Sequence, residues 1–489
     1  MTDMIRVGID VGGTKVAAGL VDSVGHLLAE SRILSRPDLS AAEMSGLIFE
    51  QVSELLTANG FSWSKVERVG MGFPGAFTGP NGTLESAPNL PNFVGQEPAS
   101  LLADVLKERL GEFPPILADN DTVVAVLAEA RLGAGKGARR VLYLTVSTGV
   151  GGARYDGHRA ENIEPGLSIF PDPERPKIHL EALAGGALLA KQARSQLLEF
   201  LREGEEALAG RTRLLDLVEF PGTTAEEKLE HLTTRHLGEA AAAGDVYCQR
   251  LFEGAAGWVA AGLAQLLGQG WGEDRIVVGG SVAEKVPGFL DRVRAVLGWH
   301  QQESSAPPGL SRFRVEDGLV AAGLGSERGV LGAVFLAAEA SRAPRRSVRW
   351  ITAEQARPIR QSILRPHQEP EACVYEGDES EGSAHFGAVR SGQLVGVASI
   401  YRQNPRGEED PFSWRLRGMA TLENVRGHGY GLALLEACIH HARRQGGMRL
   451  WCNARTSVSE FYGKGGFKVR GEEFDLPGLG PHFVMELEL

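Results

Sequence analysis

Apolar and polar positions along the first part of the chain alternate as strands followed by helices. Ile5–Val11 is a continuous apolar run that predicts a buried strand, and Val16–Val21 predicts its hairpin partner. Ala41–Leu56 follows a helical period behind a polar start. The other elements predicted before residue 340 are strands at Leu27–Ile33, Val66–Phe73, Ile116–Ala118, Val141–Val146 and Arg275–Val278, and helices at Leu101–Leu110, Thr122–Leu132, Glu181–Glu203, Val246–Leu267 and Arg328–Glu339. Strands and helices that alternate over two successive halves predict an α/β fold.

The pattern begins anew near residue 348. Residues 340–348 combine small residues, one proline and three arginines, which is typical of a linker. We therefore predict a domain of residues 1–340 with lobes of about 1–120 and 121–340, a linker at 341–347, and a domain of residues 348–489. The elements predicted in the last domain are helices at Glu354–Leu364, Leu432–Arg444 and Val458–Lys464, and strands at Ser383–Arg390, Leu394–Tyr401, Trp414–Ala420 and Arg449–Asn453, with closing strands after them.

Composition narrows the class of protein. A chain of 489 residues is too long for one hydrophobic core, which agrees with several domains. The formal net charge of −11 argues against a general nucleic-acid binder. The four cysteines form no CxxC pair, so we expect buried free thiols in a reducing cytoplasm. The sequence shows neither a signal peptide nor a stretch that we expect to span a bilayer.

Three glycine-containing turns after predicted strands suggest a site for a nucleotide triphosphate. Glycine lets the backbone approach phosphate closely, and a threonine hydroxyl adds a donor. An aspartate at the end of the first strand is placed to orient Mg²⁺, usually through water. The residues concerned are Asp10, Gly12, Gly13, Thr14 and Lys15 in the first turn, Thr148, Gly149 and Gly151 in the second, and Gly279 and Gly280, beside the adenosine, in the third.

Asn120 and Asp121 stand at a predicted boundary between a strand and a helix. The carboxylate of Asp121 could accept the proton of a substrate hydroxyl that attacks the γ-phosphate. The alternative is a helix N-cap, because aspartate is common in that position. The two flanking phosphate loops favour the role of a base.

Together these residues resemble the ROK family of sugar kinases and related repressors, in the actin-like ATPase fold with its duplicated ribonuclease H-like domain. The resemblance covers about residues 4–340 and includes Gly70–Gly75 and the sugar-binding loop Ala87–Pro91. It implies ATP with Mg²⁺, Asp121 as catalytic base and a possible homodimer. Family repressors carry a DNA-binding helix-turn-helix before the first strand, and here that strand begins near residue 5, so we expect no nucleic-acid partner. The residues it implies at the sugar are Gly75, Asn89, Asn120, Asp121 and Glu181.

The chain departs from the family where other sugar contacts are usual. Aligned as Gly166–Phe170, the usual Gly-Glu-x-Gly-His element has Leu167 and Phe170 in place of its acid and histidine. The cysteine-rich motif is absent, so we expect no structural zinc and a structural role for His179. A site that lost these groups would select a substrate other than plain glucose. A modified polyol, or a sensor that binds a ligand without turnover, are the two alternatives.

Another glycine-rich loop, Arg426–Gly431, lies between a predicted strand and an amphipathic helix of the last domain. Its backbone N–H groups can converge on a pyrophosphate at the helix N-terminus. With Arg417–Thr421, Trp451–Arg455 and Phe461–Phe467 around it, this loop resembles that of the GNAT acyltransferase superfamily, an α/β domain with a mixed sheet, over about residues 347–489. The residues that the resemblance places on acetyl-CoA are Met419, Thr421, Arg426, Gly427, His428, Gly429, Tyr430, Gly431, Leu432 and Asn453.

Acetyl transfer also needs an acid and a base. The resemblance makes Tyr462 the acid that protonates the leaving thiolate, and the alternative is a buried aromatic anchor. The base stays open among Glu408, Glu409, Asp410 and Glu423, while His482 is expected to be structural. The sequence thus predicts a cytoplasmic bifunctional protein that phosphorylates a sugar-like hydroxyl and acetylates an amine, with a kinase-fold sensor as the alternative for the first domain.

Overall fold

The computed structural model describes residues 4–78, 82–170, 178–269, 271–303, 306–339, 347–380, 382–390, 393–405, 408 and 410–489. The chain divides into two compact units, one formed by residues 1–120 with 336–489 and the other by residues 121–335. The predicted linker lies outside the described residues, except for Ser347, which begins a strand.

Residues 5–120 form a five-stranded sheet with the order β3-β2-β1-β4-β7. Its strands are β1 (Ile5–Val11), β2 (Lys15–Val21), β3 (Leu27–Leu34), β4 (Val66–Phe73) and β7 (Ile116–Asn120). Strand β1 is antiparallel to β2 and parallel to β4, which is parallel to β7. The parallel strands therefore carry their carboxyl ends, with Asp10, Gly72 and Asn120, to one edge of the sheet. A small hairpin, β5 (Ala76–Phe77) and β6 (Leu84–Ser86), follows β4.

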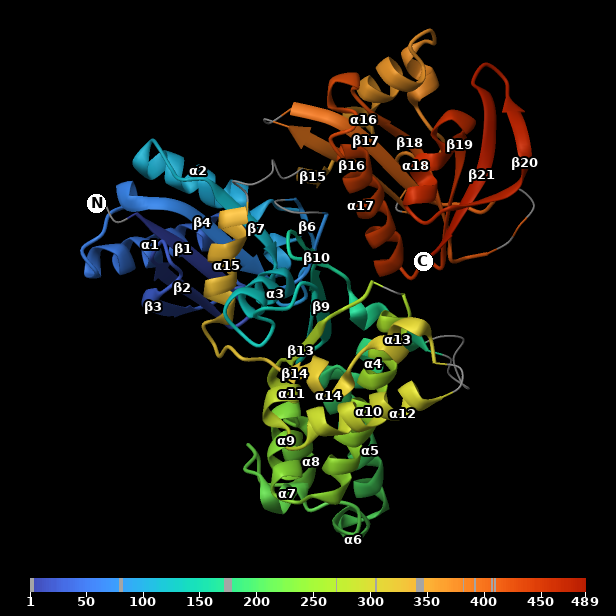
Figure 1. Ribbon diagram of the computed structural model, residues 1–489. Coiled ribbons are helices and arrows are strands. Elements are labelled where there is room, and N and C mark those ends of the chain that lie inside the picture. Colours follow the sequence, from blue (N-terminus) through green and yellow to red (C-terminus); the bar gives the residue numbers. More distant parts are fainter. Residues whose placement is uncertain are drawn as a thin grey trace. The chain divides into compact units, whose positions relative to one another are not determined.

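Two helices, α1 (Ala41–Ala58) and α2 (Pro98–Leu110), share one hydrophobic core with this sheet (Figure 1). A capping box begins α1: the Glu43 N–H donates to Ser40 Oγ at 3.2 Å, and the Ser40 N–H donates to Glu43 Oε2 at 2.8 Å. This pairing satisfies two N–H groups that a helix start leaves without partners.

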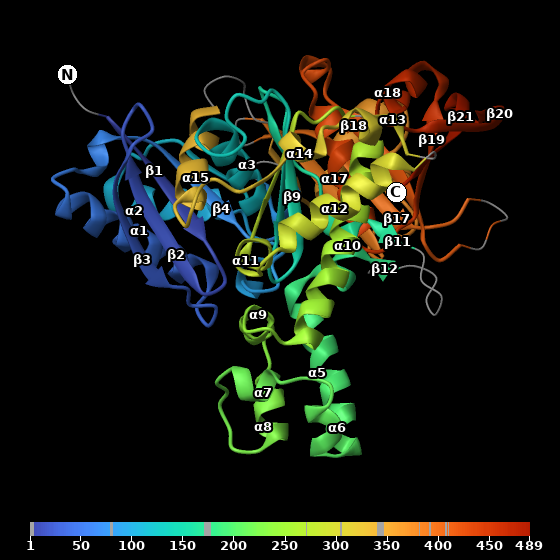
Figure 2. The ribbon, with the colours of Figure 1, turned by 60° about the horizontal axis from the view of Figure 1, so that its bottom comes forward.

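Residues 121–335 contain a second five-stranded sheet, with the order β10-β9-β8-β13-β14. Its strands are β8 (Val141–Val146), β9 (Val150–Tyr155), β10 (Ala160–Asn162), β13 (Arg275–Gly279) and β14 (Leu319–Ala321). The helices of this part are α3 (Asp121–Arg131), α4 (Leu180–Ala184), α5 (Gly186–Glu203), α6 (Glu205–Ala209), α7 (Leu214–Leu217), α8 (Ala225–Glu230), α9 (Thr234–Ala242), α10 (Val246–Gly268), α11 (Ser281–Lys285), α12 (Phe289–Gln302), α13 (Pro308–Arg312), α14 (Val315–Gly318) and the greater part of α15 (Arg328–Glu339). Figure 2 shows α5 to α8 as a helical extension of this unit.

The single helix predicted over Glu181–Glu203 is wrong, because the chain forms α4 and α5 with a break at Gly185. The backbone of Gly185 is extended there (φ −69°, ψ 129°). The break lets the first residue of α5 bind a neighbouring loop, since the Gly186 N–H donates to the Ser147 carbonyl at 2.8 Å.

Helix α10 is the longest of the described helices, with 23 residues. Its length and composition would also suit a membrane-crossing helix, and half of its most apolar window is buried. Phe252, Val259 and Leu263 on α10 belong to the core of residues 121–335. The four cysteines are free and buried, as the sequence predicts.

The last domain is built on a seven-stranded sheet with the order β15-β16-β17-β18-β19-β21-β20. Its strands are β15 (Ser347–Trp350), β16 (Ser383–Arg390), β17 (Gln393–Arg402), β18 (Ser413–Thr421), β19 (Arg449–Arg455), β20 (Lys468–Leu476) and β21 (Gly480–Glu488). Strands β18 and β19 pair parallel and the other neighbours pair antiparallel, which confirms the predicted mixed sheet.

Helices cover both faces of this sheet (Figure 1). The core of one face includes α17 (Tyr430–Arg444) and Tyr462 of α18 (Ser459–Lys464), whereas α16 (Ala353–Ile359) packs on the other face against Val397 and Ala420. The helix predicted over Glu354–Leu364 continues past α16 only as a π-helical turn, Arg360–Leu364. Pro358 inside α16 supplies no N–H for the regular ladder, which accounts for the change in winding.

Candidate functional sites

The first phosphate loop is the turn between β1 and β2. The Gly12 N–H donates to the Lys15 carbonyl at 2.8 Å, and the Ser35 N–H donates to the Thr14 carbonyl at 3.0 Å. Neither glycine of the turn has a left-handed backbone. A Cβ on Gly13 would instead lie 2.4 Å from the Cβ of Asn89. Glycine is required because the Asn89 side chain approaches the loop, so a predicted phosphate contact and a predicted sugar contact are neighbours.

Gly75 and Asn120, both predicted at the sugar, are joined by a hydrogen bond. Asn120 Nδ2 donates to the Gly75 carbonyl at 2.6 Å. Gly75 has a φ of 131°, and a Cβ there would lie 1.9 Å from the Ser86 carbonyl oxygen. Only glycine fits this position, which therefore fixes the turn that holds Asn120.

Sequence reasoning missed Asp119, the buried residue before Asn120. The β-ladder places Asp10 opposite Gly72 and Gly72 opposite Asp119, so both carboxylates belong to the same face of three adjacent strands. Mg²⁺ usually binds one or two carboxylates together with water and substrate phosphates, and this donor set fits it. Within the ranges that the structure describes, no three His, Cys, Asp or Glu side chains form a metal cluster.

The second phosphate loop, between β8 and β9, is held by the start of α5. The Ser147 N–H donates to the Gly149 carbonyl at 2.9 Å, and the Ala187 N–H donates to the Thr148 carbonyl at 2.9 Å. A Cβ on Gly149 would lie 3.1 Å from the Glu181 carboxylate. The loop and the predicted sugar ligand Glu181 are thus close neighbours.

Two further predicted glycines make close contacts at the same hairpin, Gly280 from outside it and Gly151 from within β9. A Cβ on Gly280 would lie 2.5 Å from Thr145 Oγ1, and one on Gly151 would lie 3.0 Å from the Thr122 methyl group. Thr122 follows Asp121, which is itself the first residue of α3, one position earlier than predicted. The second loop, the end of β13 and the start of α3 therefore form one cluster.

A buried ion-pair network braces the end of β13. Arg328 donates to Glu129 Oε1 at 3.0 Å, to the Tyr143 hydroxyl at 2.7 Å and to Glu284 Oε1 at 2.9 Å. Gly279 lies against this network, because a Cβ there would be 2.7 Å from the Tyr143 oxygen. Burial raises the pKa of Tyr143 to about 12, so its hydroxyl stays protonated at neutral pH.

Glu164 is a second carboxylate that sequence reasoning missed. It has a left-handed backbone (φ 45°), which is unusual for any residue except glycine. Burial raises the pKa of Glu164, although a hydrogen bond from Asn162 opposes this effect. The charge of Glu181 raises that pKa further. Burial also raises the pKa of Glu181, although a hydrogen bond from the Val150 N–H and the charge of His179 oppose this effect. The signal in the sequence was an acid directly before Pro165 and Gly166.

Phe170 does not stand at a ligand position. Its ring packs edge-to-face on Trp258 with 5.3 Å between the centroids, inside the core of residues 121–335. Phe170 is therefore a core residue, whereas Glu164 is an acid on which the charge of Glu181 acts. The side chain of Leu167 lies outside the described part of the chain.

The loop before α17 presents backbone donors. Gly427 and Gly429 have φ values of 76° and 79°, which glycine adopts without strain. Gly429 precedes α17, and no side chain caps that helix among the described residues. The first N–H groups of α17 lack intrahelical partners and suit an anion. The Tyr430 ring is buried in the core, so this residue can offer only its N–H.

Strands β18 and β19 separate beside this loop. Their pairing covers three residue pairs and ends at Arg415 and Trp451, although β18 continues to Thr421 and β19 to Arg455. The strand ends with Met419, Thr421 and Asn453 therefore flank an opening in the sheet. A Cβ on Gly431 would lie 3.8 Å from Met419 Cε, which brings the loop to this opening.

Tyr462 reaches the same place from α18. Its hydroxyl lies 3.8 Å from Met419 Sδ, and burial raises the pKa of Tyr462 well above its usual range. Edge-to-face contacts with Phe461 and Phe467, at centroid distances of 5.2 and 5.6 Å, hold the ring. A neutral hydroxyl at the opening can donate a proton.

The candidate bases of acetyl transfer differ in the side chains that they contact. Glu408 lies 2.7 Å from Arg449 and 2.6 Å from Arg470, and the hydrogen bond from Arg449 is the main cause of its lowered pKa. Asp410 lies 3.4 Å from Arg449. Glu423 is exposed beside Arg426, while the buried His482 has its Nδ1 2.7 Å from the Gly480 carbonyl oxygen. Ion pairing makes Glu408 a poor proton acceptor, and Glu409 lies outside the described residues.

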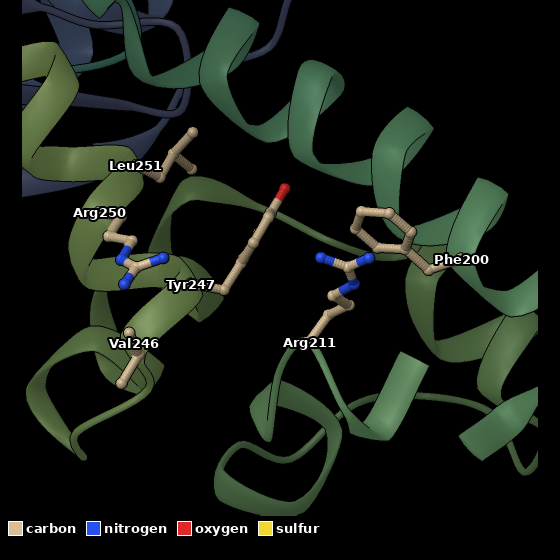
Figure 3. A pocket seen from close by; sticks show the side chains of 6 residues that line it. All are labelled: Phe200, Arg211, Val246, Tyr247, Arg250 and Leu251. Carbon is tan, nitrogen blue, oxygen red and sulfur yellow. The ribbon is translucent and has the colours of Figure 1, made fainter. Parts of the chain in front are cut away.

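An open hollow lies between α5, α10 and the turn before α7 (Figure 3). It is lined by Phe200, Arg211, Val246, Tyr247, Arg250 and Leu251. The Arg211 guanidinium stacks on Phe200, and the Tyr247 hydroxyl donates to Gln196 Oε1 at 2.9 Å. None of the residues predicted from sequence lies in it.

Comparisons with known proteins agree with both halves of the sequence reading. Residues 6–160 match the ROK family model, and residues 348–467 match the acetyltransferase (GNAT) family model. The uncharacterised N-acetyltransferase YitI of Bacillus subtilis is 43% identical over 138 residues, which cover 28% of this chain and 93% of YitI. A glucokinase of Streptomyces coelicolor is 26% identical over 345 residues, which cover 68% of this chain and 98% of the glucokinase.

A solved structure supports the fold of the longer region. The ROK family glucokinase from Streptomyces griseus, in complex with glucose and AMPPNP, matches with a TM-score of 0.52 and 26% identity, and the match covers 68% of this chain and 99% of that one. The predicted actin-like fold is therefore confirmed. The chain joins a ROK family region to a C-terminal domain that belongs to the GNAT N-acetyltransferase family.

Proposed function

We propose that the C-terminal domain transfers an acetyl group from acetyl-CoA to an amine. The observation that carries this proposal is the opening between β18 and β19, which meets the uncapped start of α17 and the Tyr462 hydroxyl. A pyrophosphate is suited to the N–H groups of Gly427 to Leu432, and the amides of a pantetheine arm can pair with the free edge of β18 beyond Arg415.

In this reaction the neutral amine nitrogen forms a bond to the thioester carbonyl carbon, and the carbon–sulfur bond breaks. Acetyl-CoA supplies the activated acyl group. Tyr462 donates its proton to the leaving thiolate and is restored from solvent. The proton released by the amine passes to water, since Glu408 and Asp410 are engaged by arginines.

Binding and transfer are tested separately. Calorimetry with coenzyme A should show binding that Gly429→Val weakens, because valine strains a left-handed position at the helix start. Acetyl transfer is then followed by thiol release over a panel of amines. If coenzyme A does not bind to the intact protein, the proposal is refuted.

For the N-terminal region we propose ATP-dependent phosphorylation of a sugar-like hydroxyl. The contact of Gly13 with Asn89 carries this proposal, since it joins a phosphate-binding turn to a sugar-binding loop. Asp121 accepts the hydroxyl proton as the oxygen attacks the γ-phosphorus and the bond to the β-phosphate breaks. Asp10 would hold Mg²⁺ through water, and the metal would neutralise phosphate charge.

Glu164 and Glu181 supply the carboxylates that the sequence alignment left in doubt. Two neighbouring acids with raised pKa values are suited to sugar hydroxyls, which can donate to them. This reading favours a polyhydroxylated substrate over a less polar one. The related glucokinases support a hexose or a close derivative.

The test is ADP release across neutral sugars, amino sugars and polyols, with Glu164→Gln as the probe of the missed acid. We expect turnover with at least one hexose and a rise in KM of about 10-fold in the variant, because a hydrogen bond to a charged group contributes about 1.5–3 kcal/mol. Sugar binding without any ADP release would favour the sensor alternative. Both reactions use cytoplasmic cofactors, so we propose a cytoplasmic location.

A further inference from the structure

Four arginines gather on the face of the C-terminal sheet that α16 covers, and we call them the arginine face. They are Arg365, Arg415, Arg417 and Arg455. The guanidinium carbon of Arg417 lies 4.1 Å from the centroid of the Tyr375 ring, and that of Arg365 lies 5.7 Å from the same centroid. Arg415 lies over the Trp451 ring at 4.7 Å. Aromatic rings thus orient three of the four guanidinium groups.

The arginine face adjoins the proposed reaction centre. Arg415 and Arg417 are the last arginines of β18 before Gly418, whose φ of 66° accompanies a register shift against β17. The parallel pairing with β19 ends at Arg415, so Arg417 lies at the mouth of the opening. Arg455 is the last residue of β19 on the other side, and its Nη2 donates to the Leu364 carbonyl at 3.0 Å.

No carboxylate neutralises these four arginines among the described residues. Arg365 donates to Gln368 at 2.8 Å and Arg415 donates to Gln403 at 3.1 Å, and both acceptors are neutral amides. The Nε of Arg415 is buried without a hydrogen-bond partner. Burial lowers the pKa of Arg415, and the charge of Arg417 lowers it further.

Two other arginines of the domain, Arg360 and Arg470, have acidic partners. Arg360, which is fully buried, binds Asp378 at 2.8 Å, and hydrogen bonds from Arg360 and Tyr401 hold the pKa of Asp378 low despite burial. Arg470 lies 2.6 Å from both Glu408 and Glu486. Arg360 and Arg470 are thus neutralised by acids, whereas the four residues of the arginine face have no such partner among the described residues.

We infer that the acetyl acceptor is an amine that also carries an anionic oxyacid group, and that the arginine face binds this group. Partly buried like charges repel each other, and a carboxylate or phosphate would relieve this repulsion through charge-assisted hydrogen bonds. Guanidinium groups present paired donors that match the oxygens of both anions. The inference rests on the proposed acetyl transfer and specifies its substrate class.

The shared chemistry has two sources, which matched acceptors distinguish. One arm compares glucosamine with glucosamine 6-phosphate, and the other compares amino acids with their amides. A preference for the phosphorylated sugar would also fit a reaction sequence in which a phosphoryl transfer supplies the acceptor. We expect kcat/KM for the anionic member of at least one pair to exceed that of its neutral partner by about 10–100-fold, the effect of one or two charge-assisted bonds.

Variants of the full-length protein assign that preference to the arginine face. Arg417→Gln should raise KM for the anionic acceptor about 10-fold or more and leave the neutral partner within about 3-fold, whereas Arg417→Lys should retain part of the preference. Arg470→Gln is the matched control, because it removes an arginine that has acidic partners. Thermal unfolding and coenzyme A affinity are measured for each variant to exclude a general loss of structure.

Three results would overturn the inference. Equal rates for both members of every pair, or a preference that Arg415→Gln and Arg417→Gln leave intact, would show that the arginine face does not select the acceptor. A loss of coenzyme A affinity with an unchanged acceptor preference would assign these arginines to the cofactor. Failure to bind coenzyme A at all would refute the proposed function itself, so the two failures are distinguishable.

Discussion

The glycine-rich turn between β1 and β2 and the glycine-rich loop before α17 require glycine for different reasons. In the first turn, Gly13 has an ordinary backbone and is fixed by the side chain of Asn89, from a loop far along the sequence. In the second, Gly427 has a φ of 76° and open space where a Cβ would lie. The first glycine is dictated by tertiary packing and the second by local backbone conformation. A glycine-rich motif alone does not tell these two cases apart.

The comparison predicts that damage to one reaction leaves the other intact. Asp121→Asn should lower ATP-dependent phosphorylation by about 10²–10⁴-fold, the usual contribution of a positioned general base. ADP release measures this loss, and thiol release from acetyl-CoA should stay within about 2-fold of the parent. Parallel loss of both activities would show that the two regions do not act independently.

The corresponding change in the second region is Tyr462→Phe. Removal of the proton donor should lower kcat for acetyl transfer by about 10²-fold, while the coenzyme A affinity changes little because the ring contacts remain. Tyr430→Phe is a matched control, since the Tyr430 ring lies in the core and not at the opening. Retention of full activity in Tyr462→Phe would remove this residue as the acid.

Gly13→Ala tests the packing origin of the first turn. A methyl group 2.4 Å from the Asn89 Cβ must displace the loop that carries Asn89, at a cost of about 1–3 kcal/mol. We expect a raised KM for sugar as well as for ATP. The double variant Gly13→Ala with Asn89→Gly should recover ATP affinity; if it does not, the contact with Asn89 is not the reason for glycine.

Gly427→Ala tests the local origin of the second turn and should have the smallest effect. Alanine meets no neighbouring atom there, so only the backbone strain of about 1–2 kcal/mol applies. Coenzyme A affinity should fall by about 10-fold or less. Gly427→Asn should fall less still, because asparagine tolerates the left-handed region; an equal loss in both variants would contradict the strain argument.

Strands with strong apolar patterns could be predicted from the sequence to the residue, as β1, β4 and β8 show. Glycine-containing turns and polar residues mark the ends of these strands, and both are local signals. The break at Gly185 could not be predicted in this way, because it depends on a hydrogen bond to Ser147, which lies in the turn after β8. The π-helical turn after Pro358 had a local cause that the helical pattern concealed.

The functional residues also divide into those with a local signal in the sequence and those that depend on distant parts of the chain. Tyr462 and Asn120 could be singled out by motif, and the structure gives each a partner, Met419 and Gly75. Glu164 was missed because its neighbour Glu181 lies further along the chain, and the sequence does not show that the two acids meet. The uncompensated charge of Arg417 could not be predicted, since a sequence shows which arginines are present but not which ones lack an acid nearby.

The short ladder between β18 and β19 has a consequence for the protein without its cofactor. Where the pairing ends, the amide and carbonyl groups of both strands face a gap, as at the edge of an incomplete sheet. Such an edge is a template for any extended chain that can reach it, including another copy of the protein. Acetyl-CoA would close this edge from within. The coenzyme would thus protect the domain from self-association as well as supply its acyl group, and starvation for it would become a risk of aggregation.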